Sequence, residues 1–380
     1  MERAGPTPPG GTRPADLVAI VERPGPFATV WSGRSGFGAW GRERDHARAG
    51  EARSSLAEQG APDDVLVAID RAMSGVDPGA HGVVIIADHS GVLLTEELPE
   101  APRSERAGWA PLPYLSAVLE HRQAAIPTIV VLADRNGADV VVNRPGQGER
   151  TEEITGDEYP VTKAAPGGWS QRRYQQRAQD SWERNADDVA GEVARLARTV
   201  HPDLVVLGGD ERAVTLVRGS LPEELREITR TITSGRAIDR SEQHRDRDIR
   251  RLVDTVVASE TVDVLQQFAA EDGRHQRAAN GVDATFSALQ QSQVDLLLVH
   301  DDVDDDRTAW FGPGPGQVAA DRGAIESMTT ATPSSARLVD VAIEAALRTG
   351  AGIRVVPDAA ALRSGVGALL RWANEPAAPR

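Results

Sequence analysis

A short segment in the middle of the chain holds the residue types best suited to chemistry. It contains Gly167, Gly168, Trp169, Ser170, Gln171, Arg172, Arg173 and Arg177. Two adjacent glycines let a backbone bend freely and approach another molecule closely. The arginines recur at helical spacing, where guanidinium groups can contact phosphates. The pattern predicts a loop tip suited to an RNA-lined cavity, followed by a helix from about residue 171. The alternative is a mobile surface loop in front of a solvated helix.

Gln171 is the candidate catalytic residue of this segment. Its side-chain amide, or its backbone N–H, can point at a reacting ester and stabilise the oxyanion that forms. One well-placed donor of this kind is worth roughly 10²–10³ in rate. The ester of peptidyl-tRNA is a substrate that suits a loop inserted into RNA. The segment carries no general base, so the RNA substrate or the ribosome would have to supply the remaining groups.

The sequence gives little support for metal or cofactor chemistry. It has no cysteine, which removes thiol catalysis, disulfides and Cys-ligated zinc, and its 8 histidines are scattered without a zinc-site spacing. The turn Gly208-Gly209-Asp210 follows an apolar run but lacks dinucleotide or P-loop spacing. We therefore expect no metal and no cofactor, and we interpret this turn as a strand-to-helix connection in which Asp210 caps the helix.

An acidic cluster follows the apolar run at 294–299. It consists of Asp301, Asp302, Asp304, Asp305 and Asp306. Oxygen ligands can bind Ca²⁺, but an EF-hand loop needs Gly at its sixth position and Glu at its twelfth. Counting from Asp301, Asp306 and Gly312 occupy those positions. The pattern therefore favours a solvated acidic loop.

The charge balance restricts the partners. The net charge is −15, from 42 basic and 57 acidic residues, which argues against a protein that coats nucleic acid by bulk charge. Local RNA contact fits better, because five basic and two acidic residues lie between Lys163 and Arg184. We expect no DNA partner. No stretch approaches the ~18–20 apolar residues of a membrane span, and the N-terminus lacks an apolar signal region, so we expect a cytoplasmic protein without a membrane partner.

The apolar pattern predicts an α/β fold with three domains and mixed sheets flanked by helices. The first domain covers residues 1–122. Two apolar runs within 17–31, broken by Pro-Gly-Pro, predict two strands joined by a turn. The charged, Ala-rich segment 36–60 predicts a helix, and the apolar runs within 83–98 predict two further strands.

The second predicted domain covers residues 123–235 and the third covers residues 236–380. In the second, two apolar runs within 127–143 flank an Asn-Gly pair, which is the strongest short-range signal for a hairpin. A loop and a long helix to about residue 199 follow, and then a buried strand. In the third, helical and strand patterns alternate, and residues 361–372 contain an apolar run with two interior glycines.

The middle of the chain resembles the archaeal and eukaryotic class-I release factor and Pelota superfamily, and most closely its bacterial branch of Balon-like ribosome hibernation factors. The stretch PGGWSQRRYQQRAQDSWERNADDVAGEVARLA is similar to the family's Gly-Gly-Gln loop and the long helix after it. On this match, Gly167 and Gly168 correspond to the glycines and Gln171 to the glutamine. The resemblance also implies an N-terminal domain near the decoding centre and a C-terminal L7Ae-like α/β/α domain. The stretch GIRVVPDAAALRSGVGALLRW looks like the closing strand and glycine-containing helix of that domain.

One departure from the family pattern concerns the reaction. Trp169 and Ser170 separate Gly168 from Gln171, whereas release factors have Gly-Gly-Gln unbroken. The resemblance therefore implies a ribosome-binding factor that occupies the A site of idle or stalled 70S ribosomes under stress. Ribosomal RNA and the elongation GTPase that delivers tRNA are its implied partners. One alternative is a peptidyl-tRNA hydrolase acting in rescue through Gln171, and another is an interaction protein unrelated to ribosomes.

Overall fold

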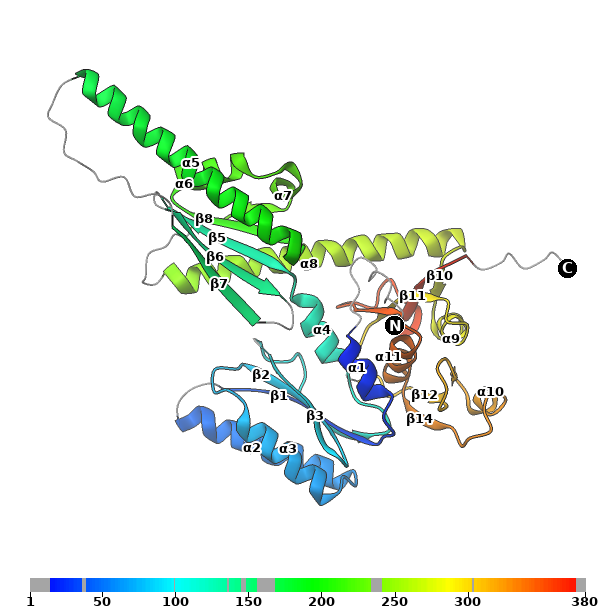
Figure 1. Ribbon diagram of the computed structural model, residues 1–380. Coiled ribbons are helices and arrows are strands. Elements are labelled where there is room, and N and C mark those ends of the chain that lie inside the picture. The colour runs from blue at the N-terminus through cyan, green and yellow to red at the C-terminus, as the bar shows by residue number, and fades with distance from the viewer. Residues whose placement is uncertain are drawn as a thin grey trace. The chain divides into compact units, whose positions relative to one another are not determined.

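The computed structural model describes most of the chain, which forms two compact units. The described residues are 14–35, 39–98, 100–134, 137–144, 148–155, 168–233, 241–302 and 304–373. Unit 1 combines Met1–Gln123 with Glu260–Arg380, and unit 2 is Ala124–Ser259. The sheets are mixed and flanked by helices, which confirms the predicted α/β class (Figure 1). The division into three domains and the L7Ae-like character of the last one stay predictions.

The N-terminal part of unit 1 is a four-stranded antiparallel sheet with helices on both faces. Its elements are α1 (Ala15–Val21), β1 (Phe27–Gly33), α2 (Ala39–Glu58), α3 (Asp63–Gly75), β2 (Gly82–Asp88), β3 (Gly91–Leu98), β4 (Arg106–Ala110) and α4 (Ser116–Ala124). The strand order is β3-β2-β1-β4. Alternation along β1 sends Val30 toward α2 and α3 and Trp31 to the opposite face. The predicted helix within 36–60 and the strands within 83–98 are confirmed.

The first predicted strand of the chain is wrong, because residues 15–21 form helix α1. Leu17, Ile20 and Val21 are its buried residues, and their spacing of three and four places them on one helical face. A short apolar run does not separate a strand from a buried helix. Only the second run, which became β1, is a strand as expected.

The C-terminal part of unit 1 holds a four-stranded mixed sheet and a small antiparallel sheet. Its elements are β10 (Ala278–Asn280), α9 (Val282–Gln290), β11 (Val294–Val299), β12 (Thr308–Phe311), β13 (Val318–Ala319), α10 (Arg322–Glu326), β14 (Ser334–Arg337), α11 (Leu338–Arg348), β15 (Gly352–Val355), the short 3-10 turn η1 (Arg363–Gly365) and β16 (Val366–Leu370). The larger sheet has the order β10-β16-β11-β15, and the smaller has the order β13-β12-β14. Helix α11 is buried along nearly all of its length.

The expected helix at the end of this part is also wrong, because residues 366–370 form strand β16. The strand pairs antiparallel with β10 on one side and β11 on the other. Gly367 is explained by packing: a Cβ there would lie 2.8 Å from the ring of Phe268. Phe268 comes from the distant helix α8 (Ser241–Arg274), so local sequence does not reveal this contact.

Unit 2 is a three-layer unit built on one mixed sheet. Its strands are β5 (Thr128–Ala133), β6 (Gly137–Arg144), β7 (Gly148–Thr155), β8 (Leu204–Gly209) and β9 (Thr229–Thr231), and its helices are α5 (Gly168–Val200), α6 (Glu211–Ser220), α7 (Glu223–Glu227) and the first part of α8. The order is β7-β6-β5-β8-β9, with β5, β8 and β9 parallel. Helices α5 and α6 cover one face, and α8 covers the other. The predicted hairpin is the β5–β6 pair.

Two kinds of polar contact join the N-terminal and C-terminal parts of unit 1. Arg337 Nη2 lies 2.6 Å from Asp301 Oδ1, and the Ser116 hydroxyl donates to the other oxygen of Asp301. At the end of α4, the Gln123 side chain donates to the carbonyl of Val355 at 2.6 Å and accepts from its N–H at 2.9 Å. Gln123 thus continues the hydrogen-bond ladder at the edge strand β15.

A buried carboxyl group completes this polar region. The side chain of Asp340, in the first turn of α11, is fully buried, and neither of its oxygens accepts a hydrogen bond from the described residues. Burial raises the pKa of Asp340 to about 8, against the opposing attraction of Arg337 at 3.5 Å. The carboxyl group is therefore protonated at neutral pH. Among the described helices, none is both long and apolar enough to cross a membrane.

The protonation of Asp340 makes the stability of the protein depend on pH. Its folded pKa lies above the unfolded value of 3.8, so unfolding releases a proton between about pH 4 and about pH 8. We expect the free energy of unfolding of the natural protein, relative to Asp340→Asn, to fall as pH rises across this window, by at most about 1.4 kcal/mol per pH unit. Urea unfolding at several pH values measures this. Parallel pH profiles of the two proteins would contradict it.

Candidate functional site

The predicted site residues lie at the beginning of helix α5. Gly167 lies outside the described residues, and α5 begins at Gly168. The helix therefore starts about one turn earlier than expected, and Trp169, Ser170 and Gln171 continue it instead of forming a loop. No proline or β-branched residue in this stretch opposes a helix. The side chains of residues 168–181 lie outside the described part, so the roles of Gln171, Arg172, Arg173 and Arg177 stay predictions.

Helix α5 has two halves with different surroundings. It contains 33 residues, which corresponds to a length of about 50 Å. Its C-terminal half packs on the sheet through the buried residues Ala186, Val189, Ala190, Val193, Leu196, Ala197 and Val200. These recur every three or four residues and form one apolar stripe. The N-terminal half extends well beyond the ends of β5 and β6 (Figure 1).

Two contacts with α6 hold α5 close to the point where it leaves the sheet. The Arg212 guanidinium lies 4.6 Å from the centre of the Trp182 ring, a distance suited to cation–π attraction. One turn and a half further on, Asp187 accepts a hydrogen bond of 2.6 Å from the Ser220 hydroxyl. The part of α5 from Trp182 to Asp187 is thus held by residues at both ends of α6.

The turn between β8 and α6 positions the start of α6, which contacts α5. Gly209 has a φ of +121°, and a Cβ there would lie 1.9 Å from the carbonyl oxygen of Ala133. The carboxylate of Asp210 accepts hydrogen bonds from the N–H groups of Arg212 at 3.0 Å and Ala213 at 3.2 Å. The predicted helix-capping role of Asp210 is confirmed.

A small cavity lies beside Trp182 of α5 but does not resemble a substrate site. Its lining includes Asp134, Gly137, Trp182, Asn185 and Val189. It has room for about one water molecule. This cavity is too small to hold a substrate.

The acidic cluster after β11 is organised by arginines. Asp301 pairs with Arg337, and Asp305 pairs with Arg307 at 2.6 Å. The hydrogen bond from the Arg307 side chain holds the pKa of Asp305 below its usual value. The described residues contain no group of three or more His, Cys, Asp or Glu side chains placed to hold a metal ion.

Sequence reasoning missed two features. The pairing of Trp182 with Arg212 joins residues of different helices, and no local pattern signals it. Trp40 stands in a stretch interpreted only as a charged helix, yet its side chain is 79% exposed. A tryptophan in the first turn of a helix that is otherwise rich in charged residues is a signal that the sequence does contain.

The close contact at Gly209 predicts that this position tolerates no side chain. We expect Gly209→Ala to destabilise unit 2 by at least about 2 kcal/mol, because the new Cβ collides with Ala133 and the positive φ disfavours alanine. Gly191→Ala, in the middle of α5 with no atom near the new Cβ, is the matched control and should stabilise by about 0.5–1 kcal/mol. Urea unfolding followed by circular dichroism measures both. Equal effects of the two substitutions would contradict the steric role of Gly209.

Comparison with known proteins identifies relatives of this chain. The family model of the bacterial archaeo-eukaryotic release factor family 2 matches residues 127–274, the segment that contains α5 and α8. Two proteins of Mycobacterium tuberculosis, uncharacterized protein Rv2629 of strain ATCC 25618 / H37Rv and uncharacterized protein MT2704 of strain CDC 1551 / Oshkosh, are each 26% identical to the chain over 359 residues. Each alignment covers 93% of this chain and 95% of the relative.

Solved structures give weaker likenesses. Pelota of Archaeoglobus fulgidus is 16% identical with a TM-score of 0.36, over 76% of this chain and 79% of that one. A structure of ribosome-bound archaeal Pelota and ABCE1 gives 12% identity and a TM-score of 0.42, over 96% of both chains. The family match over residues 127–274 thus confirms the predicted resemblance of this chain to the bacterial branch of the archaeo-eukaryotic release factor superfamily.

Proposed function

We propose that this chain is a cytoplasmic, ribosome-associated translation factor that occupies the A site of idle or stalled 70S ribosomes. The observation that carries the proposal is the division of α5 into a packed half and an extended half. The extended half begins at Gly168 and carries Arg172, Arg173 and Arg177. The matched family model includes this helix.

The N-terminal end of α5 is suited to binding ribosomal RNA. The first four N–H groups of a helix lack intrahelical partners, and the helix dipole places positive charge there. Phosphate groups bind such helix ends, and arginines in the following turns add charge-assisted contacts. The net charge of −15 is unfavourable for broad contact with RNA, which favours binding through local groups of arginines such as this one. The elongation GTPase that delivers tRNA is the proposed protein partner.

Occupation fits this segment better than cleavage. Trp169 and Ser170 interrupt the glycine–glutamine sequence, and the segment has no general base. A peptidyl-tRNA hydrolase is the second candidate, because Gln171 is the fourth residue of α5 and its N–H is among the first four of the helix. Such a donor can stabilise an oxyanion.

Co-sedimentation with ribosomes separates these functions. We expect the purified protein to pellet with vacant 70S ribosomes and with ribosomes that carry peptidyl-tRNA, without releasing the peptide. We expect Gln171→Ala to pellet equally well, because occupation does not need the glutamine donor. Peptide release that Gln171→Ala abolishes would establish the hydrolase instead. A protein that pellets with neither ribosome preparation contradicts both ribosomal functions.

The arginines at the start of α5 predict a salt dependence. We expect the combined substitution of Arg172, Arg173 and Arg177 by Ala to weaken ribosome binding and to reduce its salt slope by about two to three, since each phosphate contact contributes about 0.7–0.9. Arg198→Ala, an exposed arginine at the other end of the same helix, is the control and should leave the slope unchanged. Pelleting across about 50–200 mM salt measures both. Salt-insensitive binding by the natural protein would argue against this docking.

A further inference from the structure

Trp40 is an aromatic side chain without a packing role. It lies in the first turn of α2, and at 79% exposure it is the most exposed large apolar side chain among the described residues. The buried contacts of α2 are made by its later turns, where Leu56 enters the core between the sheet and α3. Burial therefore does not explain a tryptophan at this position.

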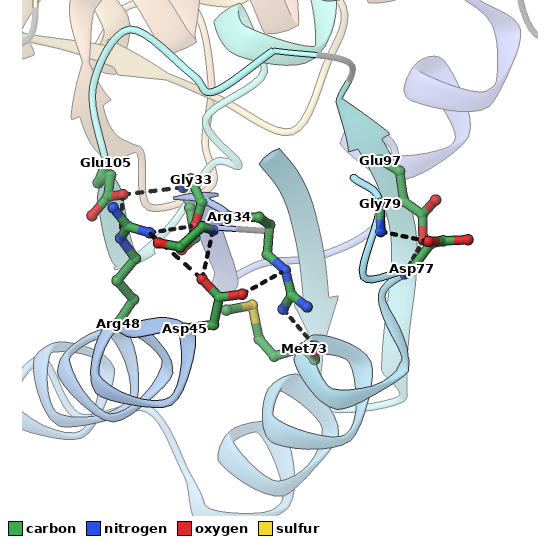
Figure 2. Close-up of polar contacts among 11 residues, drawn as sticks. Gly33, Arg34, Asp45, Arg48, Met73, Asp77, Gly79, Glu97 and Glu105 are labelled. Atoms are coloured by element: carbon green, nitrogen blue, oxygen red, sulfur yellow. Dashed lines mark hydrogen bonds and ion pairs between the residues drawn. The ribbon is translucent and has the colours of Figure 1, made fainter. Parts of the chain in front are cut away.

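A network of polar contacts joins the end of β1 to the turns of α2 that follow Trp40 (Figure 2). Asp45 of α2 accepts a hydrogen bond of 2.8 Å from the N–H of Ser35 and lies 3.4 Å from Arg34 Nε. Arg48, one turn later, donates to the Ser35 hydroxyl at 2.7 Å and to the carbonyl of Gly33 at 3.4 Å. The end of β1 and the second and third turns of α2 are thus held together.

The same network reaches two neighbouring elements (Figure 2). Glu105, just before β4, lies 2.9 Å from Arg48 Nε and accepts a hydrogen bond of 3.1 Å from the N–H of Gly33. Arg34 donates to the carbonyl of Met73 in α3 at 3.3 Å. The side chains of Arg34 and Asp45 are only 13% and 11% exposed, so this attraction is largely shielded from solvent. Each cation of this network faces a carboxylate.

The charges beside Trp40 are arranged differently. Arg42 and Arg44 are exposed, and within the described parts of the chain neither makes an ion pair or a hydrogen bond. Arg44 follows Trp40 by four residues, so the two side chains lie on the same helical face. Glu43 is the acidic neighbour on that side. Arg44 thus lies beside the most exposed aromatic ring among the described residues without an ion-pair partner there.

We propose that Trp40 and Arg44 bind an unpaired nucleotide of RNA, with the indole stacked on the base and the guanidinium on the adjacent phosphate. Stacking on an aromatic side chain accepts any base, because every base has a π-face. A protein-binding patch would need further apolar neighbours, whereas the first described residues after Trp40 on α2 with exposed side chains, Arg42, Glu43 and Arg44, are charged. The proposal rests on the proposed association with ribosomes and adds a second RNA contact, on unit 1, to that of α5.

The test compares substitutions at two exposed tryptophans. The probes are vacant 70S ribosomes and a fluorescent oligouridine RNA of about 12 nucleotides. We expect Trp40→Ala to weaken oligouridine binding roughly 5- to 150-fold and Trp40→Phe to retain most of it, since phenylalanine also stacks. Trp372→Ala, at a side chain that is 52% exposed, is the control and should bind as the natural protein does. Thermal unfolding verifies that each variant is folded.

The neighbouring charges predict opposite effects. Arg44→Ala should weaken oligouridine binding and reduce its salt slope by about one, because one phosphate contact is lost. Glu43→Gln should strengthen binding, because it removes a carboxylate that repels phosphate. An unchanged affinity of Trp40→Ala, or an equal loss in Trp372→Ala, overturns the proposal.

The two probes also separate this proposal from the ribosomal function. If the natural protein pellets with ribosomes and Trp40→Ala does so equally well and binds oligouridine normally, the nucleotide site is wrong and the ribosomal function stands. If oligouridine binding depends on Trp40 while no variant pellets with ribosomes, the nucleotide site stands and the ribosomal function is wrong. Binding to neither probe contradicts both.

Discussion

The burial of one apolar stripe of α5 on the sheet of unit 2 is the constraint on which the proposed site depends. An isolated helix is marginally stable in water, because its first turn is costly to form and propagation gains little per residue. The stripe from Ala186 to Val200 overcomes this cost in the packed half. The extended half then only has to propagate from an existing helix. The contacts of α6 with Trp182 and Asp187 set the direction in which it leaves the sheet.

The parts of the fold that sequence predicted correctly are those decided by neighbouring residues. The Asn-Gly hairpin and the cap by Asp210 each need only a few adjacent positions, and both are confirmed. Residues 15–21 and 366–370 were assigned wrongly, because a short apolar run carries no period that separates a helix from a strand. The structure of residues 366–370 also involves a distant contact, because Gly367 packs against Phe268, about a hundred positions away in the chain.

The candidate sites divide in the same way. The glycines, the glutamine and the arginines of the middle segment were visible as a pattern, and α5 begins within that pattern. The polar network beside Trp40 could not be predicted, because Asp45 and Arg48 meet Gly33, Ser35 and Glu105 only after the sheet has formed. Ion pairs of this kind depend on tertiary distance, which leaves no period or spacing in the sequence.

The interrupted course of unit 1 along the chain has a consequence for biosynthesis. Unit 2 is continuous, so it can fold as soon as its own residues have left the ribosomal exit tunnel. The sheet face that carries Phe27, Trp31 and Ile86 belongs to one apolar cluster with α11, which is translated more than 200 residues later than β2. Helices α1 and α4 join this cluster early in synthesis, whereas α11 is made near the end, so the apolar surface that α11 buries stays exposed on the nascent chain until the last part has been translated.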